Sequence, residues 1–443
     1  MNPQPRAVSD QRKLRRVLTL SDLILYGIIV IQPTAPMPIF GVVSQQARGH
    51  VVSAVLIAMI AMLFTAISYG RMARVYPSAG SAYTYVGNAL HPTLGYLTGW
   101  SITMDYLLNP IICTIWCSKA AQNFAPWSPY PAFVCMFAVL FTILNLRGVK
   151  TSAQFNRWMV AGMSMVVVIF FWYAVEFLSA QHLAAADFVR PVYDSSTFSW
   201  SALSRGTAIA ALTYIGFDSV STLSEEVANP RRNIMLATVL TCVITGFLAA
   251  AEVYAGQLVW PDFRHYPDVD TAFVHVAGRV GGPFLFGLVN LTLLVATVGS
   301  GAAAQLGAAR LLFGMGRDDV IPKKFFGALS TRGVPHYNVL FSGALTLAAS
   351  LALSYELSVE LLNFGAFIAF MGVNASALAQ GGAKSRWHWK NSLPSILGFS
   401  VCFYIWLNLS GTAKIAGGSW LAAGLAYGAT RGSLKRRPAA IVD

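Results

Sequence analysis

Long apolar stretches alternate with short polar segments along almost the whole chain. A stretch of about 20 apolar residues is long enough to cross a bilayer as a helix. The pattern therefore predicts an all-α integral membrane protein of about 12 transmembrane helices, within one membrane domain over residues 17–430. The predicted spans are 18–43, 51–73, 91–121, 131–146, 156–179, 203–226, 234–259, 284–312, 337–354, 359–381, 392–410 and 415–430.

Two of the predicted spans contain residues that interrupt a helix. The first carries QPTAP, from Gln32 to Pro36, followed by Pro38, and the sixth carries TYIGFDS, with Gly216 and Asp218 at membrane depth. A proline withholds a backbone donor and obstructs the preceding helical turn, so three within one short segment predict unwinding. Because the interrupted spans are five apart, they indicate a 5+5 inverted repeat with helices 1 and 6 broken and two extra helices after it.

Composition and charge agree with this interpretation. The chain is 56% hydrophobic and only 11% charged, where a soluble domain carries about 25% charged residues. Its net charge of +13 comes mostly from short Lys and Arg clusters in alternate loops. That arrangement follows the positive-inside rule and does not indicate nucleic-acid binding. It predicts that the tails, residues 1–16 and 431–443, both lie in the cytoplasm.

Several other classes of protein are excluded by what the sequence lacks. The motifs H-E-x-x-H, G-x-S-x-G and G-x-x-x-x-G-K-[ST] do not occur, so neither an enzyme of those types nor an ATP-driven pump is indicated. The five cysteines all fall in apolar segments, which favours buried thiols over a disulfide framework. Neither a cofactor nor a metal site is predicted.

The unwound part of the first span is a candidate substrate-binding segment. Backbone groups that leave a helix inside a membrane persist only where protein or a water-filled cavity satisfies them. The freed groups of Gln32, Pro33, Thr34 and Ala35 are then available to a polar ligand. The alternative is a proline-kinked helix with a structural role.

Acidic residues at membrane depth are the second set of candidates, because they are rare and costly there. Asp105 in the third span and Asp218 in the sixth have no Lys or Arg near the centre of a span, which indicates a cationic ligand, a bound proton, or both. Helix capping by Asp218 and a packing hydrogen bond by Asp105 are the alternatives. Glu225 and Glu226 precede Arg231 and Arg232 and are predicted to form a cytoplasmic gate. The role of Glu252 in the seventh span is open.

Further candidates flank these positions. Tyr214 and Phe217 stand on either side of the Gly216 break and could stack on an ammonium group, although aromatic packing is the commoner use. Ser300 lies in the small-residue run VGSGAAAQLGAA, which ordinarily marks close helix packing. We include it as a candidate that faces the unwound first span.

Five passages resemble the amino acid–polyamine–organocation superfamily of permeases, and bacterial putrescine importers in particular: FTAISYGRMARVYPSAGSAYTYV, GWSITMDYL, YIGFDSVSTLSEEVANPRRN, ARLLFGMGRDDVIPKKFFG and LLNFGAFIAF. The resemblance covers nearly the whole chain. It implies a LeuT-like fold, alternating access, and a site on spans 1, 3, 6, 8 and 10 that includes Asp105 and Asp218. The chain departs from relatives at three places. Its QPTAP break offers few N–H donors to a substrate carboxylate. Pro38 stands where polyamine importers can carry an acid, and Met163 stands where proton-coupled permeases often carry a lysine.

The sequence therefore predicts a secondary active transporter that imports a small cationic amine or polyamine, with a proton or a sodium ion as coupling ion. Two carboxylates in one pocket suit a diamine, and repulsion between them favours one holding a proton. The alternative is an amino acid permease or exchanger of the same fold, and a channel or a sensor is a more distant one. We expect a monomer or homodimer in the bacterial cytoplasmic membrane.

Overall fold

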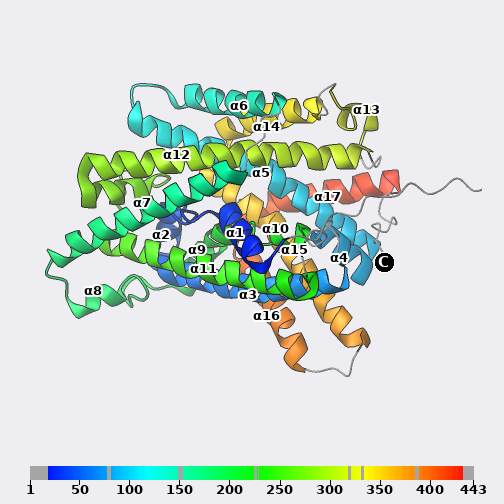
Figure 1. Cartoon of the computed structure of the whole chain (residues 1–443), viewed down its shortest axis with the longest axis horizontal. Helices are drawn as coiled ribbons and strands as arrows, with labels where there is room; N and C mark the ends of the chain where they lie inside the picture. The colour runs from blue at the N-terminus through cyan, green and yellow to red at the C-terminus, as the bar shows by residue number, and fades with distance from the viewer. Residues whose placement is uncertain are drawn as a thin grey trace, which may run out of the picture.

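The computed structural model describes residues 18–76, 81–147, 153–223, 227, 229–317, 321–330, 334–384 and 389–432. Most of these residues form long helices that lie side by side, with α12 running across the length of the molecule (Figure 1). The predicted gate residues Glu225 and Glu226, and most of both tails, lie outside the described residues.

The first half of the chain supplies spans 1 to 5. Span 1 is broken into α1 (Leu20–Ile31) and α2 (Phe40–Gln46), as predicted. The other helices of this half are α3 (Val51–Val75), α4 (Ser81–Ala89), α5 (Pro92–Phe124), α6 (Tyr130–Leu146), α7 (Ala153–Ser179) and the short α8 (Ala185–Val189).

The second half repeats this order. Span 6 is broken into α9 (Trp200–Ala210), the 3-10 turn η1 (Ala211–Tyr214) and α10 (Ser219–Thr222). Each of the twelve predicted ranges contains helix. The remaining helices are α11 (Pro230–Val259), α12 (Ala272–Arg317), α13 (Lys323–Phe326), α14 (His336–Ala352), α15 (Tyr355–Lys384), α16 (Trp389–Leu407) and α17 (Gly411–Arg431).

Fewer helices qualify as membrane spans by length and apolarity alone than the twelve spans predicted from the sequence. Among the described residues, five helices meet those two criteria, namely α3, α7, α11, α12 and α15, and the pair α16–α17, bent by 112°, makes a sixth if it is counted as one. Of the others, α6 and α14 are 17 residues long, α1 is short because its span is broken, and α5 carries polar residues. Breaks and polar residues are both expected where helices line a polar site.

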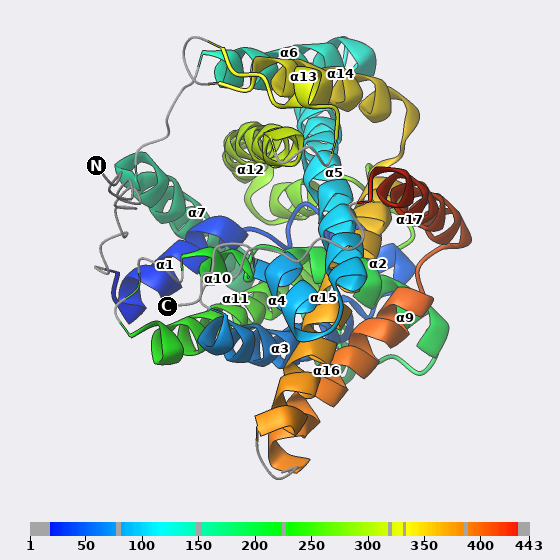
Figure 2. The same cartoon turned by 90° about the vertical axis from the view of Figure 1, so that its right-hand side faces the viewer.

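The packing of the helices displays the inverted repeat. Four of the first five spans contact their counterparts in the second half: α1 packs on α10, α3 on α11, α5 on α12, and α6 on α14. The end-on view shows α6 beside α14 and places α1 near α10 and α11 (Figure 2). Helix α7 lies at the edge, and its Trp158 and Trp172 are 71% and 73% exposed. In a membrane protein such an apolar face is covered by lipid.

One close approach fixes the position of α2. A Cβ atom added to Gly41 would lie 2.1 Å from the carbonyl oxygen of Val269 and 2.6 Å from the Cβ of Ala272. The backbone of α2 therefore touches the segment that leads into α12. Any residue larger than glycine at position 41 would prevent this contact.

We expect Gly41→Ala to lower the free energy of unfolding by about 1–3 kcal/mol, because the added methyl group must displace backbone. The measurement is the apparent unfolding temperature of the purified protein in detergent. Gly162→Ala on α7 is the matched control, since a Cβ there meets nothing within 4 Å. Equal unfolding temperatures for the two variants would contradict the close approach of α2.

Candidate functional site

The first break leaves backbone carbonyls unpaired beside α1. Helix α1 ends at Ile31, and Gln32 takes a left-handed φ of 70° while its N–H still bonds the carbonyl of Ile28 at 2.9 Å. Two turn-type bonds follow, from Ala35 N–H to the Gln32 carbonyl at 3.2 Å and from Met37 N–H to the Thr34 carbonyl at 3.1 Å. Within the described ranges, the carbonyls of Pro33, Ala35 and Pro36 accept no hydrogen bond. These are acceptors for a donor-rich ligand.

The second break lies against the first. After η1 the chain is extended at Ile215, and Gly216 takes a φ of 118° that a side chain would strain. A Cβ on Gly216 would also lie 2.8 Å from Cγ1 of Val30, in the last turn of α1. The two interrupted spans are therefore in direct contact, and Thr34 in the first break is only 2% exposed.

The two predicted aspartates come together at this point. Asp105 on α5 lies close enough to Asp218 to be affected by its charge. The Asp218 carboxylate lies near the backbone N–H groups of Gly216 and Ser219, yet it makes no capping bond to α10, which it precedes. Neither carboxylate interacts with a Lys or Arg among the described residues.

A group of tyrosines that no local sequence pattern indicates lies around the aspartates. Tyr69 on α3 and Tyr106 on α5 lie close enough to both aspartates to be affected by their charges. Tyr85 on α4 lies close to Asp218. Tyr106 is 41% exposed, so it borders the accessible side of the pair. Tyr69 and Tyr85 stand within a passage that carries the family resemblance, which was the one signal available. Which way these rings point depends on packing between distant helices.

The other predicted site residues occupy different places. Phe217 is fully buried and packs edge-on against Tyr69, with ring centroids 5.6 Å apart. Tyr214 is also fully buried, and its hydroxyl donates to the Val55 carbonyl on α3 at 2.9 Å, which makes it a tie behind the break. The hydroxyl of Ser300 on α12 lies within reach of the Cys113 thiol on α5. The roles of these three residues in binding stay predictions.

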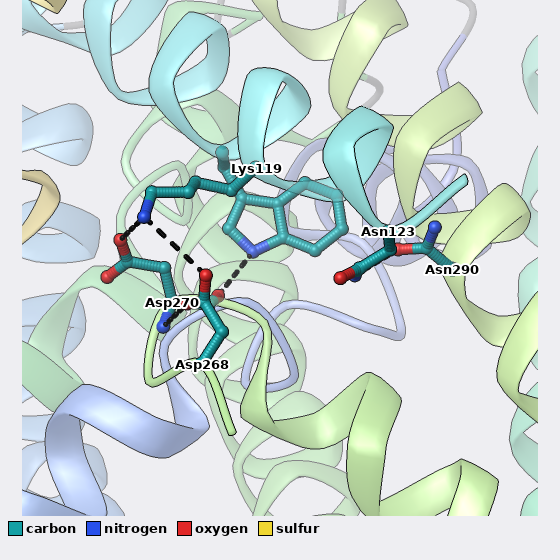
Figure 3. A network of polar contacts seen from close by, with 6 residues as sticks. Lys119, Asn123, Asp268, Asp270 and Asn290 are labelled. Atoms are coloured by element: carbon teal, nitrogen blue, oxygen red, sulfur yellow. Dashed lines mark hydrogen bonds and ion pairs between the residues drawn. The ribbon is translucent and has the colours of Figure 1, made fainter. Parts of the chain in front are cut away.

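Polar contacts also join the helices at the end of the bundle near residues 257–271, away from the two aspartates and the tyrosines around them. The ammonium of Lys119 on α5 lies 3.5 Å from Oδ2 of Asp268 and 3.8 Å from Oδ2 of Asp270, in the loop before α12 (Figure 3). Trp116 Nε1 donates to the Asp270 carbonyl at 2.9 Å. We call Lys119, Asp268 and Asp270 the loop clamp.

A second link crosses the same end. Ser44 on α2 donates to Gln257 on α11 at 2.7 Å and accepts from the Tyr266 hydroxyl at 3.0 Å. Asn123 on α5 donates to Asn290 on α12 at 3.2 Å. With the loop clamp, these bonds tie both broken and unbroken spans together where the positive-inside rule predicts the outer face.

The loops at this end also enclose a surface cavity and carry titratable groups. A cavity of about 330 Å³ is bordered by Arg48, Asp187, Arg190 and Asp194, away from the aspartate pair. Burial, with a smaller contribution from the Asp268 charge, raises the pKa of Asp270 to about 6, although Lys119 opposes the shift. Hydrogen bonds from His265 and from the backbone of Arg264 hold the pKa of Asp262 below its usual range.

No group of three His, Cys, Asp or Glu side chains in the described part of the chain is arranged to hold a metal ion. The candidate site offers two carboxylates, unpaired carbonyls and aromatic faces. Such a set binds ammonium groups by charge, by hydrogen bonds and by cation–π contact.

Comparison with known proteins agrees with this architecture. A family model described as amino acid permease matches residues 34–426. A low-affinity putrescine importer of Escherichia coli is 33% identical over 431 residues, covering 94% of this chain and 93% of its own. A branched-chain amino acid permease of Bacillus subtilis is 24% identical over 449 residues, covering 95% and 93%. A crystal structure of a mutant manganese transporter from Eremococcus coleocola matches in fold, with a TM-score of 0.56, 13% identity, and coverage of 97% and 99%.

The raised pKa of Asp270 predicts how stability depends on pH. Between its unfolded value and about pH 6 the folded protein binds a proton that the unfolded chain does not, so this group makes the fold more stable as pH falls. The unfolding temperature of the wild type should therefore gain from lowering the pH from about 7.5 to about 5, and we expect this gain to be smaller in Asp270→Asn. Asp262→Asn is the control, because a carboxyl with a lowered pKa loses its contribution only at lower pH. A wild-type gain that persists in full in Asp270→Asn would contradict the assignment.

Proposed function

Because the chain belongs to the amino acid permease family, within the amino acid–polyamine–organocation superfamily, we propose that it imports a small cationic amine, such as putrescine, in symport with a proton. That it is a transporter follows from its family and from its inverted-repeat fold. The substrate, the coupling ion and the direction are the proposal. The observation that carries it is the juxtaposition of Asp105 and Asp218 without a basic partner.

A diamine suits the charge of this site. Two carboxylates that affect each other in a membrane interior repel, and a ligand with positive charge at each end relieves that repulsion. The 33% identity to a putrescine importer supports the same class of substrate. A substrate with one charge would leave one carboxylate to hold a proton.

Backbone carbonyls and aromatic rings at the breaks also suit the ammonium group of a substrate. The unpaired carbonyls of Pro33, Ala35 and Pro36 accept N–H donors, which an ammonium supplies and a carboxylate does not. The buried rings of Tyr69 and Phe217 present aromatic surface beside Asp218. The site thus favours an amine that lacks a carboxylate.

Transport follows from the grouping of the helices. Asp218 belongs to the set formed by α1, α3, α10 and α11, whereas Asp105 lies on α5, which packs with α12. Movement of one set against the other opens the pair to either side in turn. We place residues 17–430 in a bacterial cytoplasmic membrane with both tails inside, and the loop clamp on the outer face.

Transport of amino acids by the same fold is the second candidate. It is favoured by the relative described as a branched-chain amino acid permease. The N–H groups of Gly216 and Ser219 are then the donors for a substrate carboxylate, but Asp218 already lies beside them.

We expect proteoliposomes containing the protein to accumulate labelled putrescine when a proton gradient is directed inward, and to lose accumulation when the gradient is collapsed. Unlabelled diamines should compete, and leucine should not, because leucine places a carboxylate near the aspartates. Accumulation of leucine, with no transport of or competition by amines, would overturn the amine assignment in favour of the second candidate.

We expect Asp218→Asn and Asp105→Asn each to reduce putrescine uptake by at least about tenfold, equivalent to about 1.4 kcal/mol of binding or transition-state energy. Each change keeps the shape of the side chain and removes one charge. Asp187→Asn, on α8 at the surface, is the control and should leave uptake unchanged, since its described partners are Arg190, at 3.0 Å, and the backbone N–H of Ala184, at 2.9 Å. Wild-type uptake by either site variant would remove that aspartate from the site.

A further inference from the structure

Glu252 on α11 is a buried carboxyl that the transport mechanism above does not use. Its side chain is 0% exposed, and neither carboxylate oxygen has a hydrogen-bond partner in the described part of the chain. An ionised carboxylate without a partner is among the costliest groups to place inside a protein or a membrane. A neutral, protonated carboxyl avoids most of that cost.

Contacts on either side locate Glu252 along the broken first span. Thr241, eleven residues earlier and on nearly the same face of α11, contacts the position of Gly27 on α1. Gly256, one turn later, lies against the ring of Phe40, the first residue of α2. Glu252 therefore lies between these contacts, beside residues 32–39, where the backbone is unwound.

Glu252 is separate from the aspartate pair. Cys242 on α11 lies near Asp218, and Glu252 is ten residues farther along the same helix, about 15 Å. Burial is the only influence on its ionisation among the described residues, so neither aspartate affects it. The carboxyl belongs to the half of the bundle that the loop clamp closes.

The charged and titratable groups of the surrounding elements either have other partners or have no influence on Glu252. At this level α2 and the first three turns of α3 carry none. Arg279 on α12 lies over the Trp260 ring at 5.1 Å, Tyr266 donates to Ser44, and Tyr254 donates to the Phe188 carbonyl. The remaining groups at this level are Tyr173 and Glu176 on α7 and His275 on α12, and none of them influences Glu252.

We propose that Glu252 is the binding site of the coupling proton, separate from the substrate site. The carboxyl takes a proton from the outer solution while the loop-clamp end is open, and it remains neutral when that end closes. Its O–H can then donate to one of the carbonyls that the prolines leave unpaired. The proton leaves when rearrangement of the broken span admits water from the other side. This inference rests on the proposed proton symport.

A separate site solves a problem that a cationic substrate creates. If the proton bound Asp105 or Asp218, it would compete with the amine for the same negative charge, and the two cations would exchange across the membrane. A carboxyl on the other side of the unwound segment can be occupied together with the substrate. Coupling then passes through the broken span, which touches both sites.

The test separates coupled accumulation from exchange. In proteoliposomes, Glu252→Gln, which mimics the protonated carboxyl, should lose at least about tenfold of the proton-gradient-driven accumulation of putrescine. Counterflow of labelled putrescine against unlabelled putrescine, which needs no gradient, should persist. The matched control is Glu360→Gln, another buried glutamate but one that accepts hydrogen bonds from the backbone and hydroxyl of Ser410. It should keep accumulation and counterflow in their wild-type ratio.

Two outcomes of the transport measurements would overturn the inference. One is full gradient-driven accumulation by Glu252→Gln. The other is parallel loss of accumulation and counterflow in Glu252→Gln and Glu252→Asp, which would make the side chain a structural element.

An infrared measurement keeps the site testable if the wild type proves uncoupled. Spectra of the purified protein should show the carbonyl band of a protonated carboxyl that disappears in Glu252→Gln and remains in Glu360→Gln. Absence of putrescine accumulation by the wild type, with this band present, would refute the proposed function and leave the proton site standing. Absence of the band from the wild type would refute the site itself.

Discussion

The constraint on which this structure depends is the hydrogen bonding of the backbone inside a bilayer. Each unpaired N–H or C=O in hydrocarbon costs several kcal/mol, so helices are the default and any interruption must be enclosed by protein or water. The chain interrupts itself at residues 32–39 and 215–218. They approach each other where Gly216 contacts Val30 in the last turn of α1, with α3 and α11 packed around them. The place of the site follows from that constraint before any side chain is considered.

The repeat then distributes the site between two groups of helices. Because α1, α3 and α5 each pack on the matching helix of the other half, both halves contribute to both groups. Asp105 and Asp218 come from different groups, so relative movement of the groups changes the distance between the two carboxyl groups. In the proposed mechanism, the affinity for a cation thereby depends on conformation, as a transport cycle requires.

Local patterns in the sequence were sufficient for the spans, the two breaks and each aspartate as a candidate, whereas the family resemblance implied that the two aspartates share one site. Three prolines dismantle a helix wherever they occur, and an unpaired aspartate at membrane depth needs an explanation regardless of its neighbours. Features that depend on which side of a helix faces which neighbour could not be predicted from the sequence. The loop clamp joins Lys119 to a residue 149 positions away, and the Tyr214 hydroxyl points to α3 because of how two helices pack. Glu252 was visible as an acidic residue, but its lack of partners appears only when every surrounding helix is in place.

The pairing of each span with its counterpart also has a consequence for biosynthesis. Helix α1 needs α10 and α11 to cover its broken end, and α3 needs α11, yet those helices emerge from the ribosome only after the whole first half has been made. Until the second half is inserted, the unwound segment therefore lacks the helices that cover it in the finished protein. A chain truncated before α11 lacks those contacts as well.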